Sequence, residues 1–289
     1  MTVSSKDAAE ESAAVPPRPV VERPPARAAD RGTRPALKRA IYLRDITFHL
    51  VGRDFASRHR GSSLGWLWVL VPPLVQLLVF YFVFTKVIPL RVANYPVFLL
   101  TGILAWSFFA RGISLSTLSL EHSRDLVLRP GFPSGVLPVK AVLIGLVEYA
   151  LALPVLLIAL AFSTGVQWTW VLLPVLLAIQ LVFTVGLGWM LAPLQVFFRD
   201  VQHLVTLFVL IGFWVTPVFY QRSKVPSRFH LIYTLNPMAH LIEWQRWIML
   251  HGTYPQPLSV LALSAIVIGI AVAGWAVFRR FRHSVPEEL

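Results

Sequence analysis

Long apolar runs separated by short polar segments dominate the pattern of this chain. A helix that crosses the hydrocarbon core of a bilayer needs roughly 20 predominantly apolar residues. Six runs meet this requirement, and we predict a membrane-spanning helix in each: 65–85, 97–118, 136–162, 171–197, 201–220 and 258–278. The pattern predicts an all-α integral membrane protein, in which residues 63–282 form a six-helix transmembrane domain.

Three flanking segments are too polar to cross a membrane. Residues 1–40 combine prolines, mixed charges and small side chains, which predicts a disordered cytoplasmic tail. In residues 41–62, apolar side chains are mixed with Arg and Asp at roughly helical spacing, so we expect an amphipathic helix at the membrane interface. An ordinary linker is the alternative for this segment. Residues 283–289 are expected to form a cytoplasmic C-terminal tail.

The stretch between the fifth and sixth runs is long but partly apolar. Asn236 can cap a helix and Pro237 suits its first turn, and apolar residues then recur at helical spacing. Glu243 and Arg246 are three residues apart, a spacing at which we expect an ion pair. Short helices that re-enter the outer edge of the membrane are the prediction, and a helix lying flat on the outer surface is the alternative.

Composition and charge fit a membrane protein. Of 289 residues, 56% are hydrophobic and 14% charged, and the net charge is +12. Basic residues gather at the segment ends that the positive-inside rule assigns to the cytoplasm, so we expect both termini there and the protein in the cytoplasmic (inner) membrane. Those residues are Lys38, Arg39, Arg44, Arg53, Arg58, Arg60, Arg124, Arg129, Lys140, Arg199, Arg279, Arg280 and Arg282, against Lys86, Arg91, Arg222, Lys224, Arg228 and Arg246 on the other side. The positive charge therefore indicates orientation rather than nucleic-acid binding.

The motifs of several enzyme classes are missing from the sequence. It has no GxxxxGK[ST] loop to cradle ATP phosphates, no HExxH, no GxSxG and no cysteine. We therefore expect no metal site and no cofactor in this chain, and we favour transport over catalysis. A passive channel and a membrane-embedded glycosyl- or acyltransferase remain as alternatives.

Two ionisable residues lie inside predicted spans, Arg111 in the second and Glu148 in the third. Such charges are costly in a membrane and usually face a partner or a wet cavity, so an Arg111–Glu148 pair near a translocation path is one hypothesis. The other is that Arg111 reaches toward the inner interface and Glu148 is protonated or bonded to a neighbour. Aromatic residues at helical spacing are candidates to line a channel, or to serve as packing material: Trp66, Phe80, Phe84, Phe208 and Phe219.

Four ordered blocks resemble one known family, the ABC-2-type transporter permeases, and within it the exporters of O-antigen, teichoic acid and cell-wall galactan. The blocks begin at Arg53, Thr101, Phe197 and Tyr233, with the sequences RDFASRHRGSSLGWLWVLVPPLVQLLVFYFVF, TGILAWSFFARGISLSTLSLEHSRDLVLRPGFPSGVLPV, FFRDVQHLV and YTLNPMAHLIEWQRWIMLHG. The resemblance covers about residues 41–280. An ABC-2 permease for drug or lipid efflux is the nearest rival.

The resemblance implies a homodimer that exports lipid-linked polysaccharide and is driven by two separate ATPase subunits, which bind ATP and Mg. It implies that the ATPases are contacted by the amphipathic helix and the loop 121–133, which makes Arg44, Asp45, Glu121, Arg124, Asp125, Arg129 and Phe132 candidate coupling residues. It also implies an external gate, with Asn236, Pro237, Glu243 and Arg246 as candidates, and a pore between the protomers.

Overall fold

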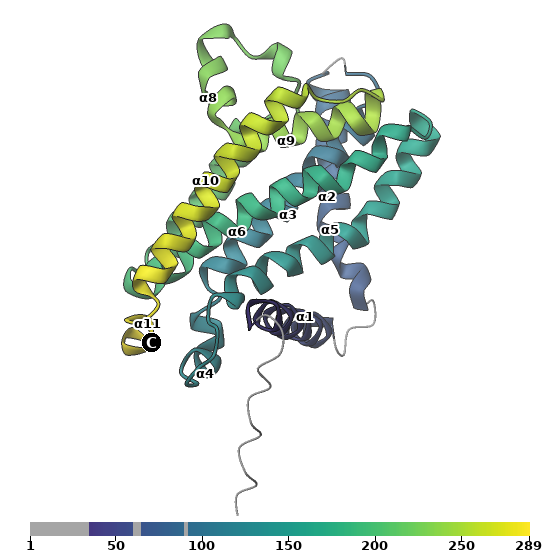
Figure 1. Cartoon of the computed structure of the whole chain (residues 1–289). Helices are drawn as coiled ribbons and strands as arrows, with labels where there is room; N and C mark the ends of the chain where they lie inside the picture. Colours follow the sequence, from purple (N-terminus) through teal and green to yellow (C-terminus); the bar gives the residue numbers. More distant parts are fainter. Residues whose placement is uncertain (1–34, 60–64, 90–91) are drawn as a thin grey trace, which may run out of the picture. The chain divides into compact units, whose positions relative to one another are not determined.

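Figure 1 shows a computed structural model of the chain, which describes residues 35–59, 65–89 and 92–289. The chain divides into two units, Met1–Arg39 and Ala40–Leu289. Of the first, residues 35–39 are described and are helical, so the predicted disorder is wrong there; residues 1–34 lie outside the described residues. The second unit contains the helical bundle.

Every element within the described residues is helical. The α-helices are α1 (Pro35–His59), α2 (Val71–Phe82), α3 (Tyr95–Thr117), α4 (Arg124–Val127), α5 (Val136–Ser163), α6 (Leu173–Phe197), α7 (Val201–Val215), α8 (His230–Leu235), α9 (Pro237–Arg246), α10 (Pro257–Phe281) and α11 (Val285–Glu288). Short 3-10 or π segments join or extend them: η1 (Gly65–Val69), η2 (Val83–Val87), η3 (Glu121–Ser123), η4 (Trp168–Leu172), η5 (Arg222–Lys224), η6 (Ser227–Phe229) and η7 (Trp247–His251). The all-α fold class is confirmed.

Five helical segments in the described part of the chain are long and apolar enough to cross a membrane, against six predicted. They are Gly65–Val87, Tyr95–Thr117, Val136–Ser163, Trp168–Phe197 and Pro257–Phe281. The remaining predicted span, 201–220, is helical only as α7. Its 15 residues rise roughly 22 Å, less than the ~30 Å hydrocarbon core of a bilayer.

Prolines explain where α7 ends and where α2 begins. Pro217 disfavours helical backbone at the residue before it, and Thr216 is extended, with φ −77° and ψ 141°, so α7 ends at Val215. In the first span, Pro72 and Pro73 occupy the first turn of α2, where proline is tolerated, and the preceding turn is the 3-10 helix η1. These two prolines start a helix segment there and do not interrupt one.

Helix α3 is the centre of the bundle. Of its most apolar 18-residue window, 78% is buried, against 6% for the first span and 17% for α10. It packs against α2, α5, α6, α7 and α9. Its side chains Leu99, Ile103 and Ala105 are completely enclosed, and α3 therefore supplies the largest share of the apolar core.

Helices α6 and α10 approach each other closely because glycines lie where they cross. A methyl group on Gly186 would lie 2.7 Å from the Ala271 Cα, and one on Gly274 would overlap the Gly186 backbone. Small residues allow such an approach in membrane bundles, where dispersion contacts replace much of the hydrophobic driving force.

Helix α1 is held against the bundle by one charged contact and a patch of apolar ones. Lys140 Nζ of α5 lies 2.7 Å from Asp54 Oδ2, and the lysine side chain is 8% exposed. Leu50 and Val51 are buried, and Leu50 packs in a cluster with Leu137 and Phe278. The amphipathic helix is therefore present, although it starts at Pro35, ends at His59 and exposes Phe48; residues 60–62 of the predicted helix lie outside the described residues.

The C-terminal segment, predicted as a cytoplasmic tail, contains a short helix that contacts the bundle. Residues 285–288 form α11, which packs on α6, and its Val285 side chain is 2% exposed. Burial of this valine in the cluster that also holds Ala192 and Val196 gives the segment a fixed place.

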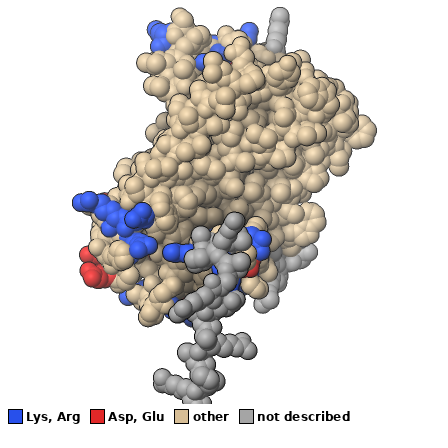
Figure 2. Space-filling view, viewed as in Figure 1, with Lys and Arg blue, Asp and Glu red and all other residues tan. Residues whose placement is uncertain are grey.

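Charged side chains are distributed as a bilayer requires. On the face shown in Figure 2, basic side chains gather near the end of α10 and near α8, and the band between them has neither acidic nor basic side chains. The last turn of α10 carries Arg279 and Arg280, and the η5–η6 region carries Arg222, Lys224 and Arg228. We call these two ends of the bundle the α11 end and the α8 end (Figure 1).

The glycine crossing is testable by comparing two glycines of the same helix. Gly274→Ala is expected to destabilise the purified protein by about 1–3 kcal/mol, because the added methyl collides with backbone. Gly269→Ala is the control: nothing lies within 4 Å of its added Cβ, so alanine there should be neutral or stabilising by up to ~1 kcal/mol. Thermal unfolding in detergent measures both, and equal midpoints would contradict the tight crossing.

Candidate functional site

The structure brings Arg111 and Glu148 together. Arg111 Nε of α3 lies 3.3 Å from Glu148 Oε2 of α5. The Arg111 side chain is 46% exposed and the Glu148 side chain 19%, so the pair lies at the surface of the protomer, within the membrane-spanning part of both helices. Pairing lowers the cost of holding either charge there, and the pair's role in transport stays a prediction.

Three of the five aromatic candidates meet in one cluster. Phe80 stacks on Phe219 with ring centroids 5.9 Å apart, and Phe84 stacks on Phe219 at 5.2 Å. Phe213 and Trp214, near the end of α7, complete the cluster around Phe80. These rings pack α2 against the end of α7, so Phe80, Phe84 and Phe219 serve as packing material in the protomer.

Trp66 and Phe208 lie apart from that cluster. Trp66 belongs to η1 and is half exposed. Phe208 is also half exposed and makes an edge contact with Phe109 of α3 at 6.4 Å. Phe208 and Phe219 do not lie on one helix, because α7 ends at Val215 and Phe219 follows a non-helical turn.

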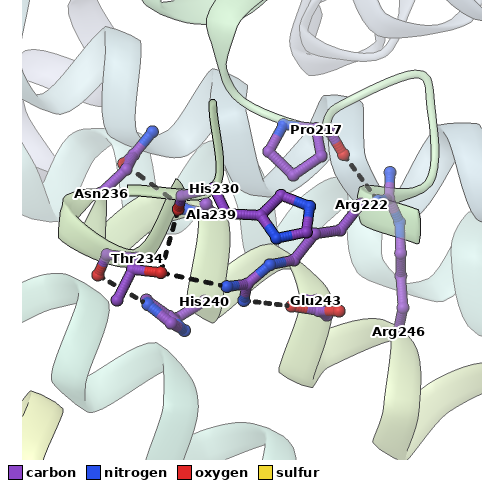
Figure 3. Close-up of polar contacts among 9 residues, drawn as sticks. All are labelled: Pro217, Arg222, His230, Thr234, Asn236, Ala239, His240, Glu243 and Arg246. Carbon is purple, nitrogen blue, oxygen red and sulfur yellow. Dashed lines mark hydrogen bonds and ion pairs between the residues drawn. The ribbon is translucent and has the colours of Figure 1, made fainter. Parts of the chain in front are cut away.

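The predicted cap of α9 is confirmed. Asn236 Oδ1 accepts hydrogen bonds from the backbone nitrogens of Met238 at 3.0 Å and Ala239 at 3.4 Å, and Pro237 occupies the first turn. The Asn236 Nδ2 also donates to Thr216 Oγ1 at 2.9 Å, just after α7. One side chain therefore starts α9 and fixes it to the end of α7. Figure 3 shows the capping contact between Asn236 and Ala239.

The predicted Glu243–Arg246 pair is not formed. Arg222 Nη1 lies 3.3 Å from Glu243 Oε2, and Arg222 Nη2 donates to Thr234 Oγ1 at 3.3 Å. Figure 3 shows the Arg222 guanidinium between these two residues. The spacing rule for helices fails here because Arg246 points into the bundle.

Arg246 donates hydrogen bonds to backbone carbonyl oxygens of neighbouring segments. Its side chain donates to the carbonyl oxygens of Phe98 at 3.2 Å, Pro217 at 2.6 Å and Val218 at 2.5 Å, and it lies over the Phe98 ring at 3.6 Å. Burial lowers the pKa of Arg246 to about 9, with Glu243 opposing the shift, so the side chain stays cationic at neutral pH. The fork of donors satisfies carbonyls released where α7 ends.

Sequence reasoning missed a buried amide ladder beside this site. Gln245 Nε2 of α9 donates to Gln180 Oε1 of α6 at 3.0 Å, and Gln180 Nε2 donates to the Ala105 carbonyl of α3 at 2.7 Å. Both glutamines are completely buried. Gln180 interrupts an apolar run, a signal that could have marked it, but its partner could not be predicted without the tertiary fold.

The candidate coupling residues lie at the α11 end or on α1. Arg124, Asp125 and Arg129 are exposed, and so are Arg44 and Asp45, which pair with each other at 2.9 Å. Glu121 Oε1 accepts from Gln195 Nε2 at 3.2 Å, and Phe132 packs on the cluster that holds α1. The charged groups are thus available to another protein, while Phe132 and Glu121 fix the loop to α6 and the bundle.

No group of three or more His, Cys, Asp or Glu that could hold a metal ion is present among the described residues. The site consists of long helices, the Arg111–Glu148 ion pair between α3 and α5, and the hydrogen bonds that hold α9 at the α8 end.

Comparison with known proteins identifies the class. Residues 47–250 match the ABC-2 type transporter family, and the chain belongs to that family; it is a multi-pass membrane protein. It is 33% identical over 257 residues to the O-antigen export system permease protein RfbA of Myxococcus xanthus, covering 88% of this chain and 99% of that protein. It is 29% identical to the RfbA of Klebsiella pneumoniae over 86% of this chain and 96% of that protein. The polysialic acid transport protein KpsM of Escherichia coli is 21% identical over 78% of this chain and 90% of that protein.

The ion pair in the spans is testable by a double-mutant cycle. Arg111→Leu and Glu148→Leu should each lower the thermal unfolding midpoint, since each leaves one charge without its partner in a low-dielectric site. The double variant should recover part of the loss, with a coupling free energy of about 1 kcal/mol or more. Arg53→Leu is the control, because its side chain is 69% exposed on α1. Purely additive effects would refute the coupling.

Proposed function

We propose that this chain is the transmembrane permease subunit of an ABC exporter that moves lipid-linked polysaccharide across the cytoplasmic membrane. The observation that carries the proposal is similarity along nearly the whole length of the O-antigen export permease of Myxococcus xanthus, 99% of which aligns with this chain. The weaker similarity to a polysialic acid transport protein supports the same substrate class, because polysialic acid is also a polysaccharide.

The energy source in this proposal is a separate pair of ATPase subunits. The sequence lacks the phosphate-binding loop that an ATPase needs, so ATP and Mg are bound by those subunits and this chain is not an enzyme by itself. Two copies of the chain form the translocation path between them. The first span supports this arrangement, because only 6% of its apolar window is buried in a single protomer and its face is free for lipid or a second copy.

Coupling to the ATPases is assigned to the α11 end of the bundle. Both termini lie in the cytoplasm in this proposal, which places α1 and the loop 121–133 on the side of the ATPases. Arg124, Asp125 and Arg129 are exposed there, and Arg44 and Asp45 are exposed on α1. The Lys140–Asp54 contact would carry a displacement of α1 directly into α5, since the two atoms are 2.7 Å apart.

The opposite end is assigned to the exit. Asn236 and Arg246 hold α9 against the end of α7 and against α3, and Glu243 holds it to Arg222 of η5. With Pro237 in its first turn, α9 forms the external gate together with α8 in this proposal. The Arg111–Glu148 pair and the aromatic residues of α2 and α7 are assigned to the translocation path.

The function is tested by removing the gene and restoring it. Deletion is expected to abolish surface polysaccharide and to cause lipid-linked glycan to accumulate in the cytoplasmic membrane. Both effects should reverse with the wild-type gene. The purified chain alone should hydrolyse ATP at background rate. Normal surface glycan in the deletion strain, or robust hydrolysis by the chain alone, would contradict the proposal.

The coupling role is tested by reversing charges in the loop. Arg124→Glu combined with Asp125→Arg should reduce export at least roughly tenfold while membrane insertion and thermal stability stay unchanged, because both side chains are exposed. The control is a single charge reversal at the α8 end, Arg228→Glu in η6, the segment directly before α8. Figure 1 shows α8 and α4 at opposite ends of the bundle. Export is measured as surface glycan at equal expression, and unchanged export in the double variant would exclude this loop from coupling.

A further inference from the structure

A cavity of about 820 Å³ opens at the α8 end of the bundle, between α8 and α9 on one side and the first turns of α10 on the other. Its size falls within the range of small-molecule binding sites. Ser259, Ala262, Leu263 and Ile266 form the α10 wall, and Thr253, Tyr254 and Gln256 form the rim. Its lining shares Pro237 and Glu243 with the proposed gate, but the cavity itself has no function assigned above.

Aromatic rings from two segments line the cavity. Trp244 of α9 is 3% exposed and fixed in the core, Trp247 follows it in η7 and is half-buried, and Tyr254 on the rim is 62% exposed. His240 packs beside Trp244 with ring centroids 5.8 Å apart. Such rings combine a flat apolar face with a polar edge, which suits ligands that have both characters.

Polar groups lie on the same lining. Arg222, Thr234, His240 and Glu243 are joined by the contacts drawn in Figure 3, in which His240 Nε2 is 3.0 Å from the Thr234 carbonyl oxygen. The Arg222–Glu243 contact uses one oxygen of the carboxylate, which leaves the other to a ligand. Both side chains are partly exposed, at 30% and 24%.

The charges of the lining decide which chemistry fits. Arg222 and Glu243 pair with each other, and the described lining has no further Arg, Lys, Asp or Glu, so it offers no unpaired cation to bind a phosphate or a carboxylate. Planar hydrogen-bonding groups beside aromatic faces instead match a pyranose, whose C–H face stacks on a ring while its hydroxyls bond to carboxylate, guanidinium, imidazole and amide groups.

We propose that this cavity is a glycan-binding site that holds a short segment of the exported polysaccharide at the exit side of the permease. The proposal rests on the proposed function, because export supplies the glycan at that side. The site takes uncharged hexose or deoxyhexose units, with Trp247 and Tyr254 as the stacking faces and Arg222, Glu243 and Gln256 as hydroxyl partners. Binding there would hold the emerging chain and oppose its backward movement.

Photo-crosslinking in cells tests the site. Tyr254 is replaced by benzoylphenylalanine, which inserts into nearby C–H bonds under ultraviolet light, and the purified chain is analysed for attached sugars by mass spectrometry. The matched control is Leu261, which is 67% exposed on α10 and does not line the cavity. We expect glycan adducts at position 254 at least roughly fivefold above those at 261.

A second variant pair separates stacking from general damage. In the position-254 background, Trp247→Ala should lower the glycan adduct roughly three- to tenfold, the expected effect of losing one ring contact, and Trp247→Phe should restore most of it. The thermal unfolding midpoint is measured for both. Equal adduct yields with alanine and phenylalanine at matched stability would overturn the stacking role and with it the site.

The outcomes distinguish this inference from the function on which it rests. If the deletion strain loses its surface glycan but the position-254 adducts are absent, equal to those at 261 or composed of phospholipid, the glycan site is overturned and the exporter function stands. If the deletion strain keeps its surface glycan, the exporter function fails and the glycan site fails with it.

Discussion

The absence of hydrogen-bond partners in the hydrocarbon core of a bilayer is the constraint on which the rest of this structure depends. Every backbone group at that depth must be bonded within the protein, so the chain crosses as long helices. Where α7 stops at Val215 and the chain turns back, carbonyl oxygens of Pro217 and Val218 are left without helical partners. Arg246 bonds both of them and Asn236 bonds Thr216, so α9 supplies what the broken helix lacks.

The same constraint makes α3 the structural link between the two ends of the permease. Near its start, the Phe98 carbonyl accepts from Arg246 of α9, and in its interior the Ala105 carbonyl accepts from Gln180, which in turn bonds α9 through Gln245. Further along, Arg111 pairs with Glu148 of α5, and α5 carries the Lys140 that holds α1. Helices α1, α5, α3 and α9 are therefore joined by a continuous series of hydrogen-bonded and packed contacts.

Some of the candidate aromatic residues pack against other rings, and others are exposed on the surface of the protomer. Phe80, Phe84 and Phe219 are stacked on one another and stabilise the contact between α2 and the end of α7, whereas Trp66 and Phe208 remain half exposed on the protomer. The cavity between α9 and α10 offers Trp247 and Tyr254 in a setting with hydrogen-bonding side chains, and that combination is what a sugar requires. The polar neighbours of Trp247 and Tyr254 are what separates the proposed glycan site from the packed rings of α2 and α7.

The sequence by itself determined the elements whose causes are local. Apolar run length defined the spanning helices, Asn236 and Pro237 defined the start of α9, and four ordered blocks identified the family. Tertiary structure decided which residues contact each other. Glu243 pairs with Arg222 instead of Arg246, and Lys140 contacts Asp54, which is 86 residues away in the sequence. Val285 is buried and anchors a segment that the sequence predicts as a tail. Helix α7 is also shorter than the apolar pattern, which continues to Tyr220. Pro217 and the hydrogen bonds of Arg246 to backbone carbonyls favour a helix end at Val215. Helix formation depends on neighbours along the chain, whereas pairing of charges depends on which helices pack together, and that information is not contained in any single segment.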